Sequence, residues 1–123
     1  METKKNEIEI NGPTYVPKGT EAKTAHSAEG LEYVIVRGDR SGVFAGYLAE
    51  KKDREVTLIN VRRLWMWSGA ASISQLAEKG TSKPSECKFP AAARKIKILD
   101  VIEILSASEE SRKSLEGVAI WEA

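Results

Sequence analysis

The sequence predicts a small α+β domain: an antiparallel, barrel-like sheet of four to five strands with two short helices. Short β-branched and aromatic runs, which are typical of strands, alternate with glycine-rich or charged turns over residues 31–67 and 95–105. Two serines stand three positions before a glutamine or glutamate, the spacing of a capping box at a helix start. The 123 residues fit one domain.

Residues 1–30 are predicted to form a flexible N-terminal arm, and residues 31–123 a single ligand-binding domain. The arm has few large apolar residues and contains the breaker Gly12-Pro13. Within it, Glu7-Ile8-Glu9-Ile10 alternates like an edge strand. His26 has no cysteine or acidic cluster nearby that suggests a catalytic partner, so we interpret it as an exposed residue without a catalytic role.

Residues 31–48 predict a β-hairpin whose loop, Gly38–Gly42, has glycine at both ends. This loop has two interpretations: a solvated hairpin tip, or an anion nest formed by Arg37, Arg40 and glycine N–H groups. The charged connector at residues 50–55 is expected to be solvated. Residues 56–61 are expected to form the third strand, which runs on through a bulge near residues 60–62.

The stretch Arg62–Trp67 holds two adjacent arginines and two of the three tryptophans. If it is extended, its side chains alternate between faces, and Arg63, Trp65 and Trp67 share the face opposite Arg62. A guanidinium pairs with phosphate and an indole stacks on a base, so the stretch suits an anionic, ring-bearing ligand. The alternative is that both tryptophans fill the core of the sheet and the arginines extend out of it.

A first helix is predicted over Ser72–Lys79, with Ser72 as N-cap and Gly80 at the C-terminal cap. The following loop, Thr81–Lys83, has two interpretations. Its three side chains could donate hydrogen bonds to phosphate, or it is an ordinary polar loop, which the missing Walker-loop spacing allows. Residues 87–90 are expected to be extended. Cys87 is interpreted as a small buried hydrophobe, because no basic partner is evident to lower its pKa.

The last part of the chain predicts more sheet and a second helix. Residues 95–105 are rich in isoleucine and valine, and Asp100 indicates a bend or bulge. Ser106 with Glu109 has the capping-box spacing and predicts a helix over Ser108–Leu115 that ends near Gly117. The apolar residues 118–121 are expected to dock as a last strand or to form an inter-subunit contact.

Composition excludes several functions. The net charge is +1 and no basic run is long, which argues against long nucleic acid as a partner. One cysteine and one histidine cannot form a disulfide framework or a His/Cys zinc cluster, so we expect no metal and no cofactor. No apolar run approaches about 18 residues, so we expect no membrane partner. The single cysteine and the lack of an apolar signal region favour a cytoplasmic location. Catalytic motifs are missing; the remaining enzymatic hypothesis is an acid/base pair of Asp100 and Glu103.

Five segments carry a resemblance: Val43–Leu48, Arg62–Ser72, Leu76-Ala77 with Gly80–Pro84, Cys87–Phe89, and Val101–Ile104. They resemble a family of small phage and prophage proteins that long carried only an unknown-function label. In the order of these elements the chain is also similar to the type-one Thoeris anti-defence sponges, over about residues 33–116. The resemblance implies a protein that is no enzyme and that holds the cyclic ADP-ribose isomer made by bacterial TIR proteins away from its effector. It also implies cyclic di- or trinucleotides as further ligands, and a homo-oligomer, such as a hexamer, with pockets between subunits.

The predicted ligand-binding residues combine this resemblance with the loops. The arginine-aromatic motif maps onto Arg62, Arg63, Trp65 and Trp67, and the remaining members of the set are Arg40, Thr81, Lys83 and Phe89. The alternative function is a phage protein–protein interaction module that inhibits a host protein through its tryptophan-rich face. That alternative predicts a large exposed apolar patch on the monomer.

Overall fold

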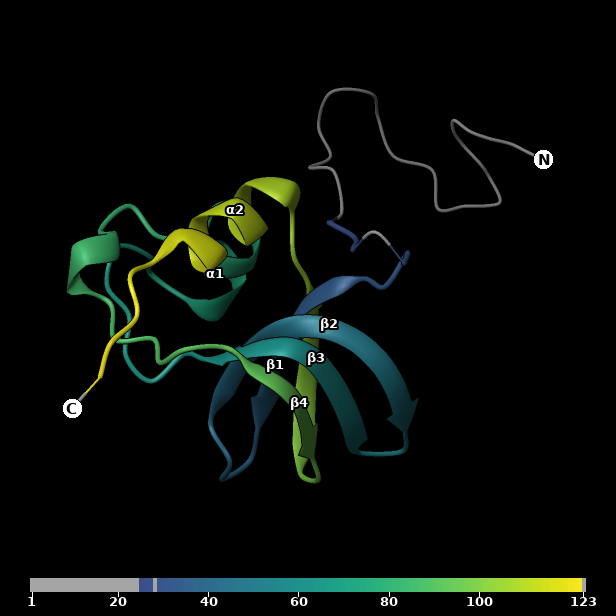
Figure 1. Cartoon of the computed structure of the whole chain (residues 1–123). Coiled ribbons are helices and arrows are strands. Elements are labelled where there is room, and N and C mark those ends of the chain that lie inside the picture. The colour runs from purple at the N-terminus through teal and green to yellow at the C-terminus, as the bar shows by residue number, and fades with distance from the viewer. Residues whose placement is uncertain (1–24, 28, 123) are drawn as a thin grey trace.

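The structure is a computed structural model and describes residues 25–27 and 29–122. It has two layers, a curled antiparallel sheet and a pair of short helices that lie against it (Figure 1). The predicted α+β class is confirmed. The sheet has five strands and is curled but not closed, so it is not a complete barrel. The alternating segment Glu7–Ile10 lies outside the described residues.

The strands, in chain order, are β1 (Tyr33–Gly38), β2 (Val43–Lys52), β3 (Glu55–Arg63), β4 (Ala93–Ile98) and β5 (Val101–Ser106). Their spatial order is β4-β3-β2-β1-β5, so β4 and β5 lie at opposite edges although only Leu99 and Asp100 separate them in the chain. The backbone N–H of Val101 donates to the carbonyl of Arg54 at 3.0 Å. The bend predicted at Asp100 is therefore a sharp corner at which the chain passes from one edge of the sheet to the other.

Strand side chains alternate between two faces and divide the apolar core in two. One cluster takes residues from all five strands, including both edges, which meet only because the sheet curls around them. Its buried members are Val34, Val36, Phe44, Val56, Leu58, Val61, Ile98 and Val101. The other cluster lies between the opposite face of the sheet and the helices, and includes Tyr33, Ile35, Ala45, Tyr47, Leu76 and Leu115.

The β2–β3 hairpin extends further into the charged connector than the sequence predicts, and its turn consists of Asp53 and Arg54. The predicted bulge is confirmed at Asn60, which has a positive φ of 51°. At this bulge β2 and β3 approach closely. A Cβ on Gly46 would lie 2.9 Å from the Cβ of Val61, so glycine is required there.

Helix α1 (Ile73–Lys79) begins as predicted, since the Ser72 hydroxyl accepts a hydrogen bond from the N–H of Gln75. Helix α2 (Glu109–Gly117) has Ser108 as its N-cap, so the start signal assigned to Ser106 is wrong. Ser106 is still in β5, and the chain stays extended through Ala107, whose N–H donates to the carbonyl of Tyr33. A short 3₁₀ helix, Pro84–Glu86, was not predicted. In the described part of the chain, neither α-helix is long and apolar enough to cross a membrane.

Ordered contacts begin before residue 31, where the sequence predicted them to start. Ala25 is fully buried; its N–H donates to the carbonyl of Ala107, and its own carbonyl accepts from the N–H of Tyr33. His26 forms an isolated bridge with Glu32 and is exposed, as expected. The end of the predicted arm is therefore part of the domain.

Candidate ligand-binding site

Arg62 and Arg63 are the last two residues of β3, and their side chains lie on opposite faces of the sheet. Arg62 pairs with Ala45, which belongs to the cluster under the helices, and Arg63 pairs with Phe44, which belongs to the inner core. Arg62 is only 6% exposed. Its guanidinium donates to four backbone carbonyl oxygens: Pro90 at 3.0 Å, Phe89 at 2.8 Å, Leu115 at 3.0 Å and Val118 at 2.6 Å. Arg62 thus holds the extended segment at Phe89 and the C-terminal end of α2 against the sheet.

This placement corrects two members of the predicted site. Arg62 donates its hydrogen bonds to the protein backbone, and burial lowers its pKa. Its side chain therefore stabilises the fold and does not face a ligand. Phe89 is fully buried, and its ring centroid lies 5.5 Å from the Arg62 guanidinium carbon. Its motif position reflects this buried cation–π contact.

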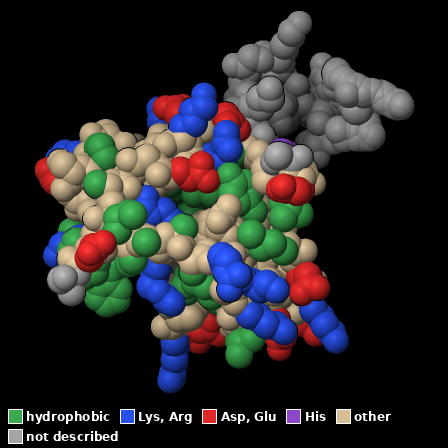
Figure 2. Space-filling model, viewed as in Figure 1, with side chains coloured by type: hydrophobic (Ala, Val, Ile, Leu, Met, Phe, Trp, Pro, Cys, Tyr) green, Lys and Arg blue, Asp and Glu red, His purple; other side chains and the backbone are tan. Residues whose placement is uncertain are grey.

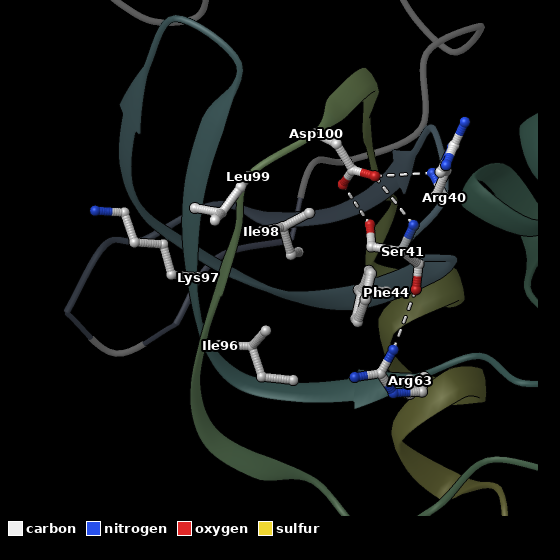
Figure 3. A pocket seen from close by; sticks show the side chains of 9 residues that line it. All are labelled: Arg40, Ser41, Phe44, Arg63, Ile96, Lys97, Ile98, Leu99 and Asp100. Carbon is white, nitrogen blue, oxygen red and sulfur yellow. Dashed lines mark hydrogen bonds between the residues drawn. The ribbon is translucent and has the colours of Figure 1, made fainter.

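Arg63 faces the other way and lies at the mouth of the curled sheet. Its guanidinium carbon is 4.6 Å from the ring centroid of Phe44, and Nη1 donates to the carbonyl of Ser41 at 3.2 Å. These residues line a hollow of about 550 Å³, whose lining also includes Arg40, Ile96, Lys97, Ile98, Leu99 and Asp100. Figure 3 shows the guanidinium reaching from beside Phe44 toward Ile96, while the side chains of Arg40 and Lys97 point outward from the rim.

The hollow combines one flat cation with apolar walls. Phe44 and Ile98 belong to the inner core, Ile96 packs against it, and Leu99 at the corner is exposed. Pockets that bind small molecules have this size and this balance of apolar lining with a few placed polar groups. Of the predicted site residues, the structure brings Arg40 and Arg63 together here. Phe44 and the β4 side chains are members that the sequence analysis missed.

The hairpin loop beside the hollow binds an anion, and that anion is the carboxylate of Asp100. Oδ2 accepts from the backbone N–H groups of Arg40 at 2.8 Å and Ser41 at 3.1 Å, and Oδ1 accepts from the Ser41 hydroxyl at 2.6 Å. The Ser41 hydroxyl and these N–H groups hold the pKa of Asp100 below its usual value of 3.8. The loop therefore directs the N–H groups of Arg40 and Ser41 at the protein's own carboxylate, and the N–H of Gly38, a glycine of the predicted nest, donates to the carbonyl of Gly42.

Arg37, predicted as part of the anion nest, and Glu103, predicted as part of an acid/base pair, form a salt bridge with each other. The Nε of Arg37 donates to Glu103 at 2.9 Å, across the β1–β5 pair. Arg37 therefore takes no part in a phosphate nest. Asp100 is held by the hairpin loop, so Asp100 and Glu103 have separate partners and do not act as a pair.

The tryptophans follow neither of the two arrangements considered from the sequence. Trp65 is 66% exposed, so it does not fill the core. Trp67 packs against the core cluster between sheet and helices, the cluster that also contains Leu64. The shared face predicted for Arg63, Trp65 and Trp67 is wrong at Trp67, which lies with Leu64 on the helix side of the sheet, and Trp65 does not line the hollow beside Arg63.

Thr81 and Lys83 do not line the hollow. The Thr81 hydroxyl donates to the carbonyl of Ser68 and accepts from the N–H of Lys83, which folds the loop onto the preceding corner. Gly69 allows this approach, since a Cβ there would lie 2.5 Å from the nitrogen of Lys83. The loop is thus an ordered turn. Cys87 beside it is buried and free, in agreement with its interpretation as a small hydrophobe.

A second surface feature is a set of exposed apolar side chains on neighbouring segments near the C-terminal end of the described chain. Backbone bridges Met66–Lys88 and Phe89–Ile120 join three short segments side by side. The exposed side chains on these segments are Trp65, Met66, Ile120 and Trp121. Large exposed apolar side chains gathered in this way mark interaction surfaces more often than isolated ones do.

No group of three or more potential metal ligands occurs in the part of the chain that the structure describes.

Comparison with known proteins gives a family and no function. No curated protein matches the sequence, and no solved structure matches it. Residues 31–115 match a family model, and this range includes Arg40, Phe44, Arg63 and the whole of β4. The chain therefore belongs to the family described as a domain of unknown function, DUF6948.

Proposed function

We propose that this domain is a non-catalytic binding protein whose ligand is a cyclic nucleotide, held in the hollow beside Arg63. The observation that carries the proposal is the Arg63 guanidinium, fixed on the Phe44 ring at the mouth of a hollow of about 550 Å³. A guanidinium has five N–H donors, and among the described residues Arg63 has one recorded acceptor, the carbonyl of Ser41. Its other donors suit the oxygens of a phosphate.

The apolar walls suit the rest of such a ligand. A base would lie against Ile96 and Leu99 while its phosphates meet Arg63. Charge-assisted hydrogen bonds are worth about 1.5–3 kcal/mol each. A cyclic ligand has little conformational entropy to lose on binding. The resemblance of the sequence to anti-defence sponges supports the narrower proposal, a phage protein that sequesters a cyclic ADP-ribose isomer, or a cyclic oligonucleotide, without cleaving it.

The proposal extends to assembly and location. We propose a homo-oligomer, of which a hexamer is one form, in the cytoplasm of the host cell. The free thiol of Cys87 suits a reducing compartment. Light scattering on the purified protein gives the mass of the assembly directly.

The test is a thermal shift of the full chain with cyclic ADP-ribose isomers and cyclic di- and trinucleotides, followed by chromatography of the ligand after heat denaturation. We expect a rise in Tm with at least one ligand and recovery of that ligand intact. A folded protein whose Tm does not change at ligand excess contradicts the proposal. Recovery of a cleaved ligand contradicts the non-catalytic part and revives a nucleotide-processing enzyme.

The set of exposed apolar side chains near the C-terminal end favours a second candidate function, a protein–protein interaction module that inhibits a host protein. Trp65 and Ile120 are 66% and 58% exposed, a large apolar area for a monomer to present to water. This candidate predicts that Trp65→Ala removes a specific host partner from affinity capture while leaving any ligand-induced rise in Tm unchanged. Equal capture by wild type and Trp65→Ala would count against it.

A further inference from the structure

Strand β4 forms one edge of the described sheet and presents two different faces. It pairs with β3 on one side, and no described strand pairs with it on the other. Ile98 is buried in the inner core and Ile96 packs against that core. Lys97, which lies between the two isoleucines, and Lys95, which precedes Ile96, are both exposed. An open edge of this kind offers a row of backbone N–H and C=O groups to an added strand.

The alternation of β4 has a counterpart earlier in the same chain. Glu7-Ile8-Glu9-Ile10 places two isoleucines on one face and two glutamates on the other. We propose that this segment adds to the free edge of β4 as a sixth strand. Ile8 and Ile10 would then continue the apolar inner face, and Glu7 and Glu9 would lie beside the lysines on the outer face. A slip of one residue would turn both glutamates toward the apolar face, so the pattern selects the pairing.

Charge favours this occupant over a second copy of β4. Basic side chains gather over this part of the sheet in Figure 2. The Nζ of Lys97 lies 3.6 Å from Oε1 of Glu55. Among the described residues no salt bridge is recorded for Lys95 or Arg94. Two β4 strands paired edge to edge would set these cations against each other, and like charges on facing strands repel. The two glutamates of the alternating segment instead supply opposite charges.

The length of chain between the two elements permits the contact. Residues 11–24 separate the segment from Ala25, the first described residue. Extended chain covers about 3.3–3.6 Å per residue, so these residues reach up to roughly 50 Å. A small domain is about 30 Å across. The segment can therefore reach β4 from Ala25, and once there it would border the wall of the hollow formed by Ile96 and Ile98.

The test is amide hydrogen exchange of the full chain, read residue by residue over β4. In an antiparallel ladder only every second N–H of a strand points to a given side. We expect every second amide of residues 93–98 to exchange at least about tenfold faster in the variant Glu7→Lys/Glu9→Lys than in the wild type. The variant Glu2→Lys/Glu21→Lys carries the same charge change outside the segment and is expected to leave these rates unchanged.

Adding Lys95→Glu/Lys97→Glu to the first variant restores the opposite charges and is expected to recover the slow exchange. Identical β4 exchange in the wild type and in Glu7→Lys/Glu9→Lys overturns the proposal. A wild-type dimer that becomes monomeric in Glu7→Lys/Glu9→Lys also overturns it, since the segment would then bind a second copy. The result is independent of ligand binding at Arg63, because the exchange is measured without ligand.

Discussion

Arg62 and Arg63 are neighbours in the sequence, and their side chains leave β3 in opposite directions. Arg62 enters the layer between sheet and helices, where four carbonyl oxygens surround its guanidinium. Arg63 lies on the Phe44 ring at the open mouth of the sheet. One arginine therefore stabilises the fold, and the other is available to a ligand.

Arg62→Ala is expected to lower the free energy of unfolding by about 3–5 kcal/mol, because buried carbonyl oxygens lose their donors. Arg63→Ala removes an exposed side chain with one cation–π contact and is expected to cost about 1 kcal/mol or less. Urea unfolding of both variants measures the difference. Equal losses for the two variants would contradict the structural role of Arg62.

Tyr33→Phe is expected to keep or raise the stability, by up to about 1 kcal/mol, because the Tyr33 hydroxyl is buried and no partner for it is recorded among the described residues. Tyr47→Phe is the matched comparison. The Tyr47 hydroxyl donates to Glu116 at 2.9 Å, so its loss is expected to cost about 1 kcal/mol. Chemical unfolding measures both. A clear loss for Tyr33→Phe would reveal a partner of that hydroxyl.

The pH dependence of Tyr33 gives a second measurement. Burial, and then the charge of Glu116, raise the pKa of Tyr33 well above its usual value of 10.0. The unfolded chain therefore ionises first, and stability is lost as the pH rises above about 10. We expect this alkaline loss to be smaller in Tyr33→Phe than in the wild type.

Ser108→Ala is expected to lower the stability by about 1–2 kcal/mol, because its hydroxyl caps α2 at the N–H of Ser111 and donates to the carbonyl of Glu78. Ser106→Ala is the control, since Ser106 is exposed at the end of β5 and the one hydrogen bond recorded for its hydroxyl among the described residues, to the Glu32 carboxylate, is also exposed. Its loss is expected to be within about 0.5 kcal/mol. A larger effect at Ser106 than at Ser108 would make Ser106 the residue that caps the helix, as its spacing from Glu109 predicts.

The Asp100 carboxylate makes the hairpin loop sensitive to acid. Its pKa in the folded chain lies below the usual value of 3.8, mainly because of the Ser41 hydroxyl, so the charged form stabilises the fold above about pH 4. This contribution is lost as the pH falls through the folded pKa. We expect Asp100→Asn to be less stable than the wild type at pH 7 and to lose less stability on acidification.

Urea midpoints between pH 2 and pH 7 measure this difference. Asp39→Asn, an exposed carboxylate in the same loop, is the control and is expected to follow the wild-type profile. Parallel profiles for Asp100→Asn and the wild type would show that the loop does not depend on this carboxylate.

Local signals in the sequence were sufficient for the hairpins, the first helix and the bulge at Asn60, because turn residues and caps act over a few positions. The start predicted for the second helix, Ser108, agrees with the structure, but its cap was assigned to Ser106 because a distant contact decides which serine caps it. The Ala107 N–H bonds to Tyr33 and keeps the chain extended past Ser106. Arg62 shows the same limit, since its acceptors lie 27 to 56 positions away in the chain.

The partner of Arg63 could have been found by counting. Eight residues back from Lys52 and eight forward from Glu55 lead to Phe44 and Arg63, which do face each other. The two register shifts between β2 and β3 cancel over this distance. The count requires a two-residue turn at Asp53 and Arg54. Every residue of the connector 50–55 is charged, so the sequence does not show which two of them form the turn. Trp65 and Trp67 could not be placed in this way, because they follow the end of the strand.

The central claim is that Arg63 holds the anionic part of a cyclic nucleotide, and calorimetric titration tests it most directly. Cyclic ADP-ribose isomers are titrated into the full chain and into the variants Arg63→Ala and Lys113→Ala, the latter removing an exposed cation on α2. We predict binding to the wild type and to Lys113→Ala, and affinity at least about tenfold weaker for Arg63→Ala. No heat of binding to the folded wild type at ligand excess, or equal affinity for Arg63→Ala, would contradict the account.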